Sequence, residues 1–307
     1  MFVGDVLDVR CTLPLVLLPG HAFDRATLLE AEFIRDFLDR RPVNPIFPPW
    51  ARYEVEHVGK DEPSGATRYV GRPLLPSEHR YYVIRYTGTN VHSQRISYAA
   101  AISDLELTFP LELVRAQGGV GWISHPIIFN HFYLSVMPPP SILVNEEALS
   151  QISRIFERMG KIEQQHPAVL RAIEMFASLN LLPPQSEFQV LGLFAIIELL
   201  ITHAPRVSEQ GDSIKHQVRT KIPLLSRHAN YPFDYRAFFG QCNEDTVWSK
   251  LYDYRSSIAH GGLPSFEKDL QMLNSRHAVV QFLRYATKSL LRYALEEPQM
   301  YADLKKC

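Results

Sequence analysis

The stretch from residue 243 to residue 262 reads NEDTVWSKLYDYRSSIAHGG, and it decides how the second half of the chain is interpreted. Asn243 or Glu244 can open a helix here, and Asp245 lies in the first turn, where the helix dipole favours a negative charge. The apolar residues that follow at helical spacing predict one buried face: Val247, Leu251, Tyr254 and Ile258. The two glycines at the end of the stretch predict a left-handed turn that ends the helix.

Arg255 and His260 are the chemically notable residues of this stretch. They lie five residues apart, so His260 is about 140° further round an ideal helix. The two side chains therefore meet only if the last turn unwinds at the glycines, or if a second chain brings another copy alongside. A helix C-terminus favours a protonated histidine, which can act as general acid or base, and an arginine matches the geometry of a phosphate. The pair indicates a phosphodiester-handling site; the structural alternative is a capping histidine and an arginine paired with a buried acid.

The composition limits the class of protein. The chain has 307 residues, of which 46% are apolar, which is enough for one large domain or two ordinary ones. Lys and Arg together number 32 and Asp and Glu 33, so binding to nucleic acid through bulk charge is disfavoured, although local contacts with RNA remain open.

Cysteine usage and hydropathy place the expected protein in the cytoplasm. Cys11, Cys242 and Cys307 are scattered, without the spacing of a zinc site or a disulfide framework. The start of the chain lacks the basic residues of a signal peptide, and the longest apolar run, 191–202, is interrupted by Glu198 and shorter than the roughly 20 residues of a membrane span. We therefore expect a soluble cytoplasmic protein with no membrane partner.

The pattern of residues predicts two domains. An α+β module is expected over 1–140, with a helix over 24–41 that has Asp24 as N-cap, and with β-like runs over 81–88, 96–109 and 121–136. The segment MPPPS (137–141) is expected to be a linker. An all-α antiparallel bundle is expected over 141–307. Its predicted helices are 145–164, 167–179, 185–203, 212–226, 244–260 and 265–295.

The residues YDYRSSIAHGG, preceded by AIIELL at 195–200, resemble the Apea-like branch of the HEPN domain family over roughly residues 165–295. The resemblance implies a HEPN-like helical bundle. Many HEPN proteins are ribonucleases that need no metal or other cofactor, and many are toxins of defence systems. They act as dimers in which the R-x4-6-H motifs of two subunits line a shared cleft.

The resemblance also implies roles for individual residues. Arg255 would hold the scissile phosphate, and His260 would assist attack by the ribose 2′-hydroxyl. Ser256 stands where characterised members often have Asn, Asp or His, and it is the third catalytic candidate. Glu198 is the candidate that would orient Arg255, although it could equally pair with any nearby base, and Tyr252, at the tyrosine position of the motif, is a further supporting candidate.

Other charged clusters are candidates for weaker roles. Basic side chains at helical spacing could follow an RNA backbone or form a solvated face. They are Lys215, Arg219 and Lys221, and Arg284, Lys288 and Arg292. His125 and His131 have no companions at metal-ligand spacing, so no metal site is expected there.

The prediction is therefore a metal-independent endoribonuclease of HEPN type, serving as an antiviral defence or abortive-infection effector. Its expected partners are RNA, a second copy in a homodimer or higher homo-oligomer, and a phage-derived trigger sensed by the first domain. The alternative is a non-catalytic HEPN module that acts as a dimeric scaffold or binds nucleotides. A third interpretation is the HEPN toxin of a toxin–antitoxin pair, which the long N-terminal module disfavours.

Overall fold

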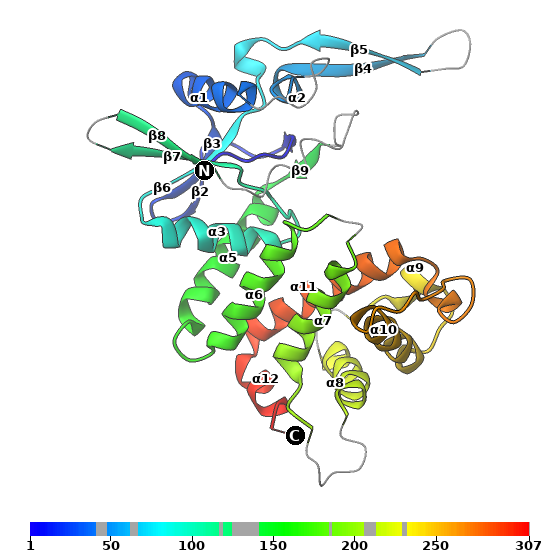
Figure 1. Ribbon diagram of the computed structural model, residues 1–307. Helices are drawn as coiled ribbons and strands as arrows, with labels where there is room; N and C mark the ends of the chain where they lie inside the picture. Colours follow the sequence, from blue (N-terminus) through cyan, green and yellow to red (C-terminus); the bar gives the residue numbers. More distant parts are fainter. Residues whose placement is uncertain are drawn as a thin grey trace. The chain divides into compact units, whose positions relative to one another are not determined.

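The computed structural model describes residues 1–40, 48–61, 67–116, 119–124, 141–183, 186–205, 213–228 and 232–306. The chain forms two compact units, Met1–Arg154 and Ile155–Cys307 (Figure 1). Residues just after 140 belong to the first unit because the strand β9 pairs with β1, near the start of the chain. His125, His131, Cys307 and all but the last residue of the expected linker 137–141 lie outside the described residues.

The first unit combines strands and helices, as predicted. Its strands are β1 (Leu7–Val9), β2 (Leu15–Leu18), β3 (His21–Arg25), β4 (Val55–Asp61), β5 (Thr67–Pro73), β6 (Tyr82–Tyr86), β7 (Leu111–Ala116), β8 (Gly119–Ser124) and β9 (Ile142–Val144). Its helices are α1 (Leu28–Asp39), α2 (Ala51–Glu54), the 3-10 turn η1 (Pro76–Glu78), α3 (Asn90–Ile102) and the first turns of α5 (Glu146–Ile162).

The start of the chain joins two parts of the sheet. Strands β2, β3 and β6 form an antiparallel sheet in that order, and β7 pairs with β8. Phe2 forms antiparallel bridges to Val83 of β6 and to Leu111 of β7, so the N-terminal segment lies between these two strands. The β4–β5 hairpin is a separate ribbon that extends away from α1 and α2 (Figure 1).

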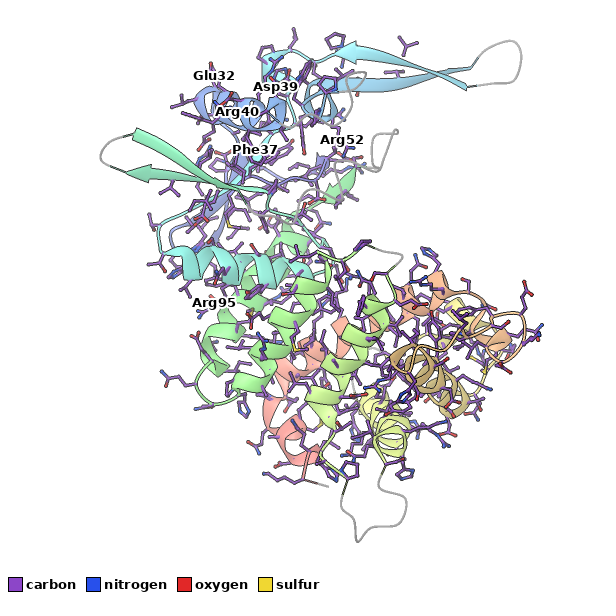
Figure 2. All side chains as sticks on the ribbon, viewed as in Figure 1. Glu32, Phe37, Asp39, Arg40, Arg52 and Arg95 are labelled. Carbon is purple, nitrogen blue, oxygen red and sulfur yellow. The ribbon has the colours of Figure 1, made fainter. Side chains whose placement is uncertain are left out.

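Helix α1 covers the sheet with an apolar face. Phe37, labelled in Figure 2, points into a core that also contains Phe2, Val83 and Leu111. The sequence predicted Asp24 as the N-cap, and this prediction is wrong. The N-cap is Thr27, because Thr27 forms a capping box with Glu30. Asp24 lies in β3 instead.

The three strands predicted in the first unit have different outcomes. The strand expected at 81–88 is confirmed by β6. The strand expected at 96–109 is wrong: the residues up to Ile102 belong to α3, and the remainder is not strand. Ile96, Ala99 and Ala100 are buried at the i, i+3, i+4 spacing of a helix, and alanine favours helix over strand. Of the third expected strand, only the part within β8 is described.

The described part of the second unit is helical. Its helices are the remainder of α5, α6 (Pro167–Leu179), α7 (Phe188–Ile201), α8 (Ile214–His228), α9 (Tyr235–Phe239), α10 (Glu244–Ala259), the 3-10 turn η3 (Gln271–Leu273), α11 (Arg276–Glu296) and α12 (Pro298–Leu304). Helix α7 packs against α6, α8, α10, α11 and α12, which explains why it is apolar around its circumference. The last long helix begins at Arg276 and not at residue 265, because Ser275 provides the N-cap.

Among the described residues, none of the helices combines the length and the apolar character that crossing a bilayer requires.

Candidate functional site

Helix α10 begins as its sequence predicts. The side chain of Asn243 accepts a hydrogen bond from the backbone N–H of Asp245 (2.9 Å), which caps the first turn. Val247, Leu251 and Tyr254 are buried, whereas Ile258, expected on the same face, is only half-buried. The side chains of the helix are therefore more exposed to solvent towards its C-terminal end, where Arg255 and His260 lie.

The end of α10 is a left-handed turn at Gly261, as predicted. Gly261 has a φ of 72°, its N–H donates to the carbonyl of Ile258 (3.0 Å), and the N–H of Gly262 donates to the carbonyl of Ser257 (2.8 Å). This double closure is the Schellman motif. A Cβ atom at Gly262 would lie 2.4 Å from the hydroxyl oxygen of Ser257, so both glycines suit this turn.

His260 is exposed at the C-cap of α10, and it remains on the helical path. Its backbone N–H still donates to the carbonyl of Ser256 (3.1 Å), because the left-handed residue comes one position later. The last turn thus stays helical as far as His260 and opens only at Gly261. In the described part of the molecule, no hydrogen bond joins the side chains of Arg255 and His260.

Arg255 lies between a carboxylate and an aromatic ring. Its Nη2 is 3.3 Å from both carboxylate oxygens of Glu198 on α7, and only the contact with Oε2 has hydrogen-bond geometry. The guanidinium lies over the ring of Tyr252, 5.6 Å from its centroid, and Tyr252 makes an edge-to-face contact with Phe194 at 5.9 Å. The side chain of Arg255 is 28% exposed, so part of it is accessible to a ligand.

Two polar atoms of this cluster are buried without a hydrogen-bond partner in the described structure: Arg255 Nε and Glu198 Oε1. Burial raises the pKa of Glu198, and the neighbouring Arg255 opposes this rise without cancelling it. Burial and the charge of Glu198 both raise the pKa of Tyr252, which keeps its hydroxyl protonated. We name Arg255, Glu198 and Tyr252 the arginine cluster; Ser256, half-buried, follows Arg255 on the same helix.

Two of the basic residues of α8, Lys215 and Arg219, are paired with acids of α10. Lys215 lies 2.5 Å from Asp253, and Arg219 makes two hydrogen bonds to Asp245 (2.9 and 2.5 Å). The pairing with Arg219 lowers the pKa of Asp245. These contacts join two helices, so an RNA backbone would have to compete with carboxylates for both cations.

Lys221, on the same helix, has a structural place that the sequence analysis missed. It is buried, and its ammonium donates to the carbonyls of Ile201 (3.1 Å) and Leu304 (2.7 Å), the last residues of α7 and α12. A lysine thus caps two helix C-termini. Nothing in its spacing distinguished it from Lys215 and Arg219.

The expected basic stripe of α11 is partly covered. Arg284 donates to the side-chain oxygen of Asn180 (2.5 Å) and lies over the ring of Phe176 at 5.2 Å. Lys288 and Arg292 are half-buried on the same helix. Arg284 therefore helps to pack α11 against α6. Contact of Arg284, Lys288 and Arg292 with RNA stays a prediction.

No group of three or more His, Cys, Asp or Glu side chains that could hold a metal ion occurs in the described ranges. The chain matches no protein-family model, no curated protein and no solved structure. The candidate site is therefore the arginine cluster together with the exposed His260, defined by its geometry alone.

Proposed function

We propose that the second unit is a metal-independent endoribonuclease of HEPN type. The observation that supports this best is the accessible guanidinium of Arg255, which is held by Glu198 and Tyr252 on the helix that ends with the exposed imidazole of His260. Glu198 takes one hydrogen bond from Arg255, so further N–H donors of the guanidinium can bind a phosphate.

In this proposal the chemistry needs no metal because the nucleophile belongs to the substrate. Arg255 binds the scissile phosphate and stabilises the negative charge that develops on it. His260 accepts the proton of the ribose 2′-hydroxyl, and the 2′-oxygen bonds to phosphorus. The bond from phosphorus to the 5′-oxygen of the next nucleotide breaks; that oxygen takes a proton from water, and the imidazolium of His260 returns its proton to the solvent. The products are a 2′,3′-cyclic phosphate and a 5′-hydroxyl.

The spacing of the motif favours a dimeric site in this proposal. Five residues correspond to about 140° around an ideal helix, so a single chain does not readily direct Arg255 and His260 to the same side. A cleft between two copies, in which the partner's His260 faces Arg255, would bring the groups to one phosphate. Ser256 would then lie beside the substrate as a hydrogen-bond donor.

The biological setting follows from the HEPN resemblance alone. It is that of a cytoplasmic defence effector that degrades RNA after a phage-derived trigger is sensed. The first unit would sense the trigger or restrain the nuclease.

The test is cleavage of total RNA by the purified full chain in EDTA. His260→Ala and Arg255→Ala should each reduce cleavage about 100-fold or more, and 2′,3′-cyclic phosphate ends should be detected in the products. His277→Ala is the matched control, because this histidine is also exposed on the second unit and should leave the rate unchanged. Equal cleavage by all four proteins, or 3′-hydroxyl products, would exclude the proposed site.

The alternative is a non-catalytic scaffold that binds a partner or a nucleotide through its HEPN-like bundle. The pairing of Arg255 with Glu198 and of Lys215 and Arg219 with acids of α10 favours it, because each cation then already has a structural role. Dimers in light scattering, together with RNA that stays intact at high protein concentration, would select this alternative.

A further inference from the structure

The contact between Arg255 and Glu198 is longer than a charge-assisted hydrogen bond usually is. Such a bond between an N–H donor and a carboxylate measures about 2.7–2.9 Å, whereas Nη2 of Arg255 is 3.3 Å from both carboxylate oxygens. The oxygen Oε1 of Glu198 is buried and accepts no hydrogen bond in the described structure. The carboxylate has therefore lost water without gaining a full set of donors in its place.

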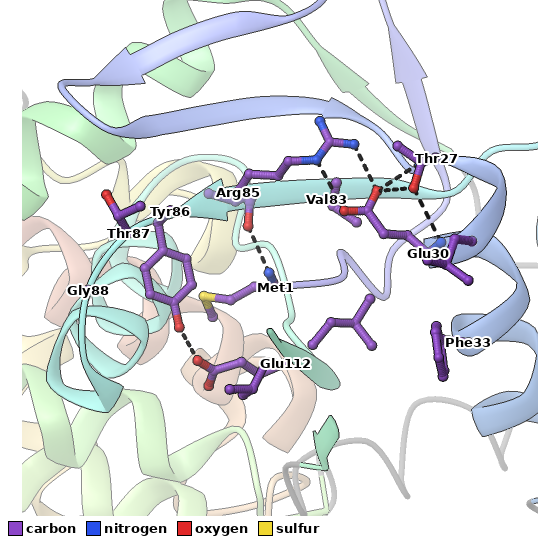
Figure 3. A pocket seen from close by; sticks show the side chains of 14 residues that line it. Met1, Thr27, Glu30, Phe33, Val83, Arg85, Tyr86, Thr87, Gly88 and Glu112 are labelled. Carbon is purple, nitrogen blue, oxygen red and sulfur yellow. Dashed lines mark hydrogen bonds and ion pairs between the residues drawn. The ribbon is translucent and has the colours of Figure 1, made fainter. Parts of the chain in front are cut away.

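A carboxylate of the first unit has the donors that Glu198 lacks. The side chain of Glu30 is 19% exposed and that of Glu198 21%, so the two are buried to a similar extent. Glu30 accepts hydrogen bonds from two nitrogens of Arg85 (3.1 and 2.8 Å) and from the backbone N–H and the hydroxyl of Thr27 (2.7 and 3.0 Å) (Figure 3). Burial alone would raise the pKa of Glu30, but these bonds lower it below its ordinary value. Burial raises the pKa of Glu198, and Arg255 opposes the rise only in part.

Few other charged groups face the carboxylate of Glu198. Its charged and titratable neighbours on α10 are Arg255 and Tyr252. Lys221 of α8 and Lys305, which follows α12, donate to backbone carbonyls of α7 and not to the carboxylate. Within the described residues, no charged side chain of α6 or α11 interacts with Glu198. In that part of the chain, the guanidinium of Arg255 is thus the one cation that balances the carboxylate.

A phosphodiester on Arg255 adds a second anion to the same cation; this step rests on the proposed function, in which Arg255 binds the scissile phosphate. The guanidinium has one positive charge and can neutralise one anion. With both the carboxylate and the phosphodiester ionised, a half-buried site would carry a net negative charge. Two anions that share one site raise the pKa of the weaker acid. A phosphodiester is the much stronger acid, so the proton goes to Glu198.

We propose that Glu198 is an internal competitor of the substrate: its carboxylate occupies Arg255 in the free protein and takes one proton from the solvent when a phosphodiester binds there. The site is neutral in both states, first as guanidinium and carboxylate, then as guanidinium, phosphodiester and neutral carboxyl. Binding therefore weakens as the pH rises through the range in which the free protein has an ionised Glu198 and the complex a protonated one. In that range one bound proton corresponds to a fall in affinity of up to about tenfold per pH unit.

The first experiment measures the binding of a probe that cannot be cleaved. The probe is a short, fluorescently labelled oligodeoxyuridine, which has phosphodiesters but no 2′-hydroxyl, so its binding does not depend on ribonuclease activity. By fluorescence anisotropy at constant ionic strength, the affinity of the wild-type full chain should fall at least about tenfold between about pH 5 and pH 8. Glu198→Gln keeps the shape of the side chain but has no carboxylate. This variant should vary less with pH and should bind about tenfold more tightly than the wild type at pH 8.

Two further variants control this experiment. Asp253→Asn removes a carboxylate from the exposed face of the same helix but leaves the contact between Arg255 and Glu198 in place, so it should keep the pH dependence of the wild type. Arg255→Ala should bind the probe at least about tenfold more weakly at pH 5. Three results would each overturn the proposal: equal pH dependence in the wild type and Glu198→Gln, no tighter binding by Glu198→Gln at pH 8, or binding that Arg255→Ala leaves unchanged.

The second experiment counts the protons that the full chain takes up when the same probe binds, and it needs no variant of Glu198. Isothermal titration calorimetry in two buffers of different ionisation enthalpy gives this number. We expect the wild type to take up most of one proton per bound probe near pH 6, and His260→Asn, which removes the exposed histidine at the end of α10, to take up as much. No uptake, or uptake that His260→Asn abolishes, would overturn the assignment to Glu198. Cleavage of RNA without proton-linked binding would contradict this inference alone, whereas proton-linked binding without cleavage would contradict the proposed function alone.

Discussion

Gly261 ends the helix that carries the motif, and replacing it with alanine isolates the cost of its left-handed backbone. Gly261 has a φ of 72°, and an added Cβ atom would meet no other atom within 4 Å. The substitution therefore creates no clash, and its cost is backbone strain of about 1–2 kcal/mol. For a unit of this size, that corresponds to a Tm lower by roughly 2–8 °C.

Differential scanning calorimetry of the full chain measures this cost on the transition of the second unit. Gly261→Asn is the matched control, because asparagine tolerates the left-handed conformation and should lose less stability than alanine. An alanine variant as stable as the wild type, or less stable by no more than the asparagine variant, would refute a left-handed residue after His260. The position of His260 at the C-cap would then be wrong as well.

Three further substitutions test the second unit. Burial raises the pKa of Glu198 above its ordinary value of 4.5, so the protein loses stability as this carboxyl ionises. Glu198→Gln has no carboxyl to titrate, so the Tm of the wild type should fall relative to that of the variant as the pH rises from 4.5 to 7. A difference in Tm that stays constant with pH would contradict this. Lys221→Met leaves the carbonyls that end α7 and α12 without their charged donor, and the free energy of unfolding measured in urea should fall by about 3 kcal/mol. A fall below about 1 kcal/mol would argue against the capping role. Tyr235→Phe removes the acceptor of the buried Trp248 indole N–H (3.0 Å) and should cost about 1–3 kcal/mol in the same assay, and an unchanged midpoint would show that the bond is dispensable.

The features of α10 that depend on neighbouring residues could be predicted from the sequence. The sequence offered Asn243 or Glu244 as the start of the helix and predicted a left-handed turn at the two glycines; the structure has Asn243 as the N-cap and the left-handed residue at Gly261. Both features are set by interactions within a few residues. The buried face formed by Val247, Leu251 and Tyr254 follows from the helical period. Ile258 departs from that prediction because periodicity gives the direction of a side chain but not whether another element covers it.

Long-range contacts decided what periodicity left open. The run from residue 96 to residue 109 contains residues typical of strands, but its first part is helix α3, whose alanines are buried and favour helix over strand. The basic residues Lys215, Arg219 and Lys221 look alike in the sequence. Two of them pair with carboxylates on α10, and the third caps the ends of two other helices.

The sequence by itself determined the local frame of this protein: a helix that opens at Asn243 or Glu244, is closed by a left-handed turn at the glycines that follow His260, and carries an arginine and a histidine five residues apart. Only the tertiary structure decided that Arg255 is held by Glu198 and Tyr252, and that the N-terminal segment lies between β6 and β7. The physical reason is the separation along the chain of the residues that interact. Caps and turns are satisfied by adjacent residues, whereas an ion pair across two helices or the pairing of distant strands depends on segments whose separation in the chain says nothing about their distance in space.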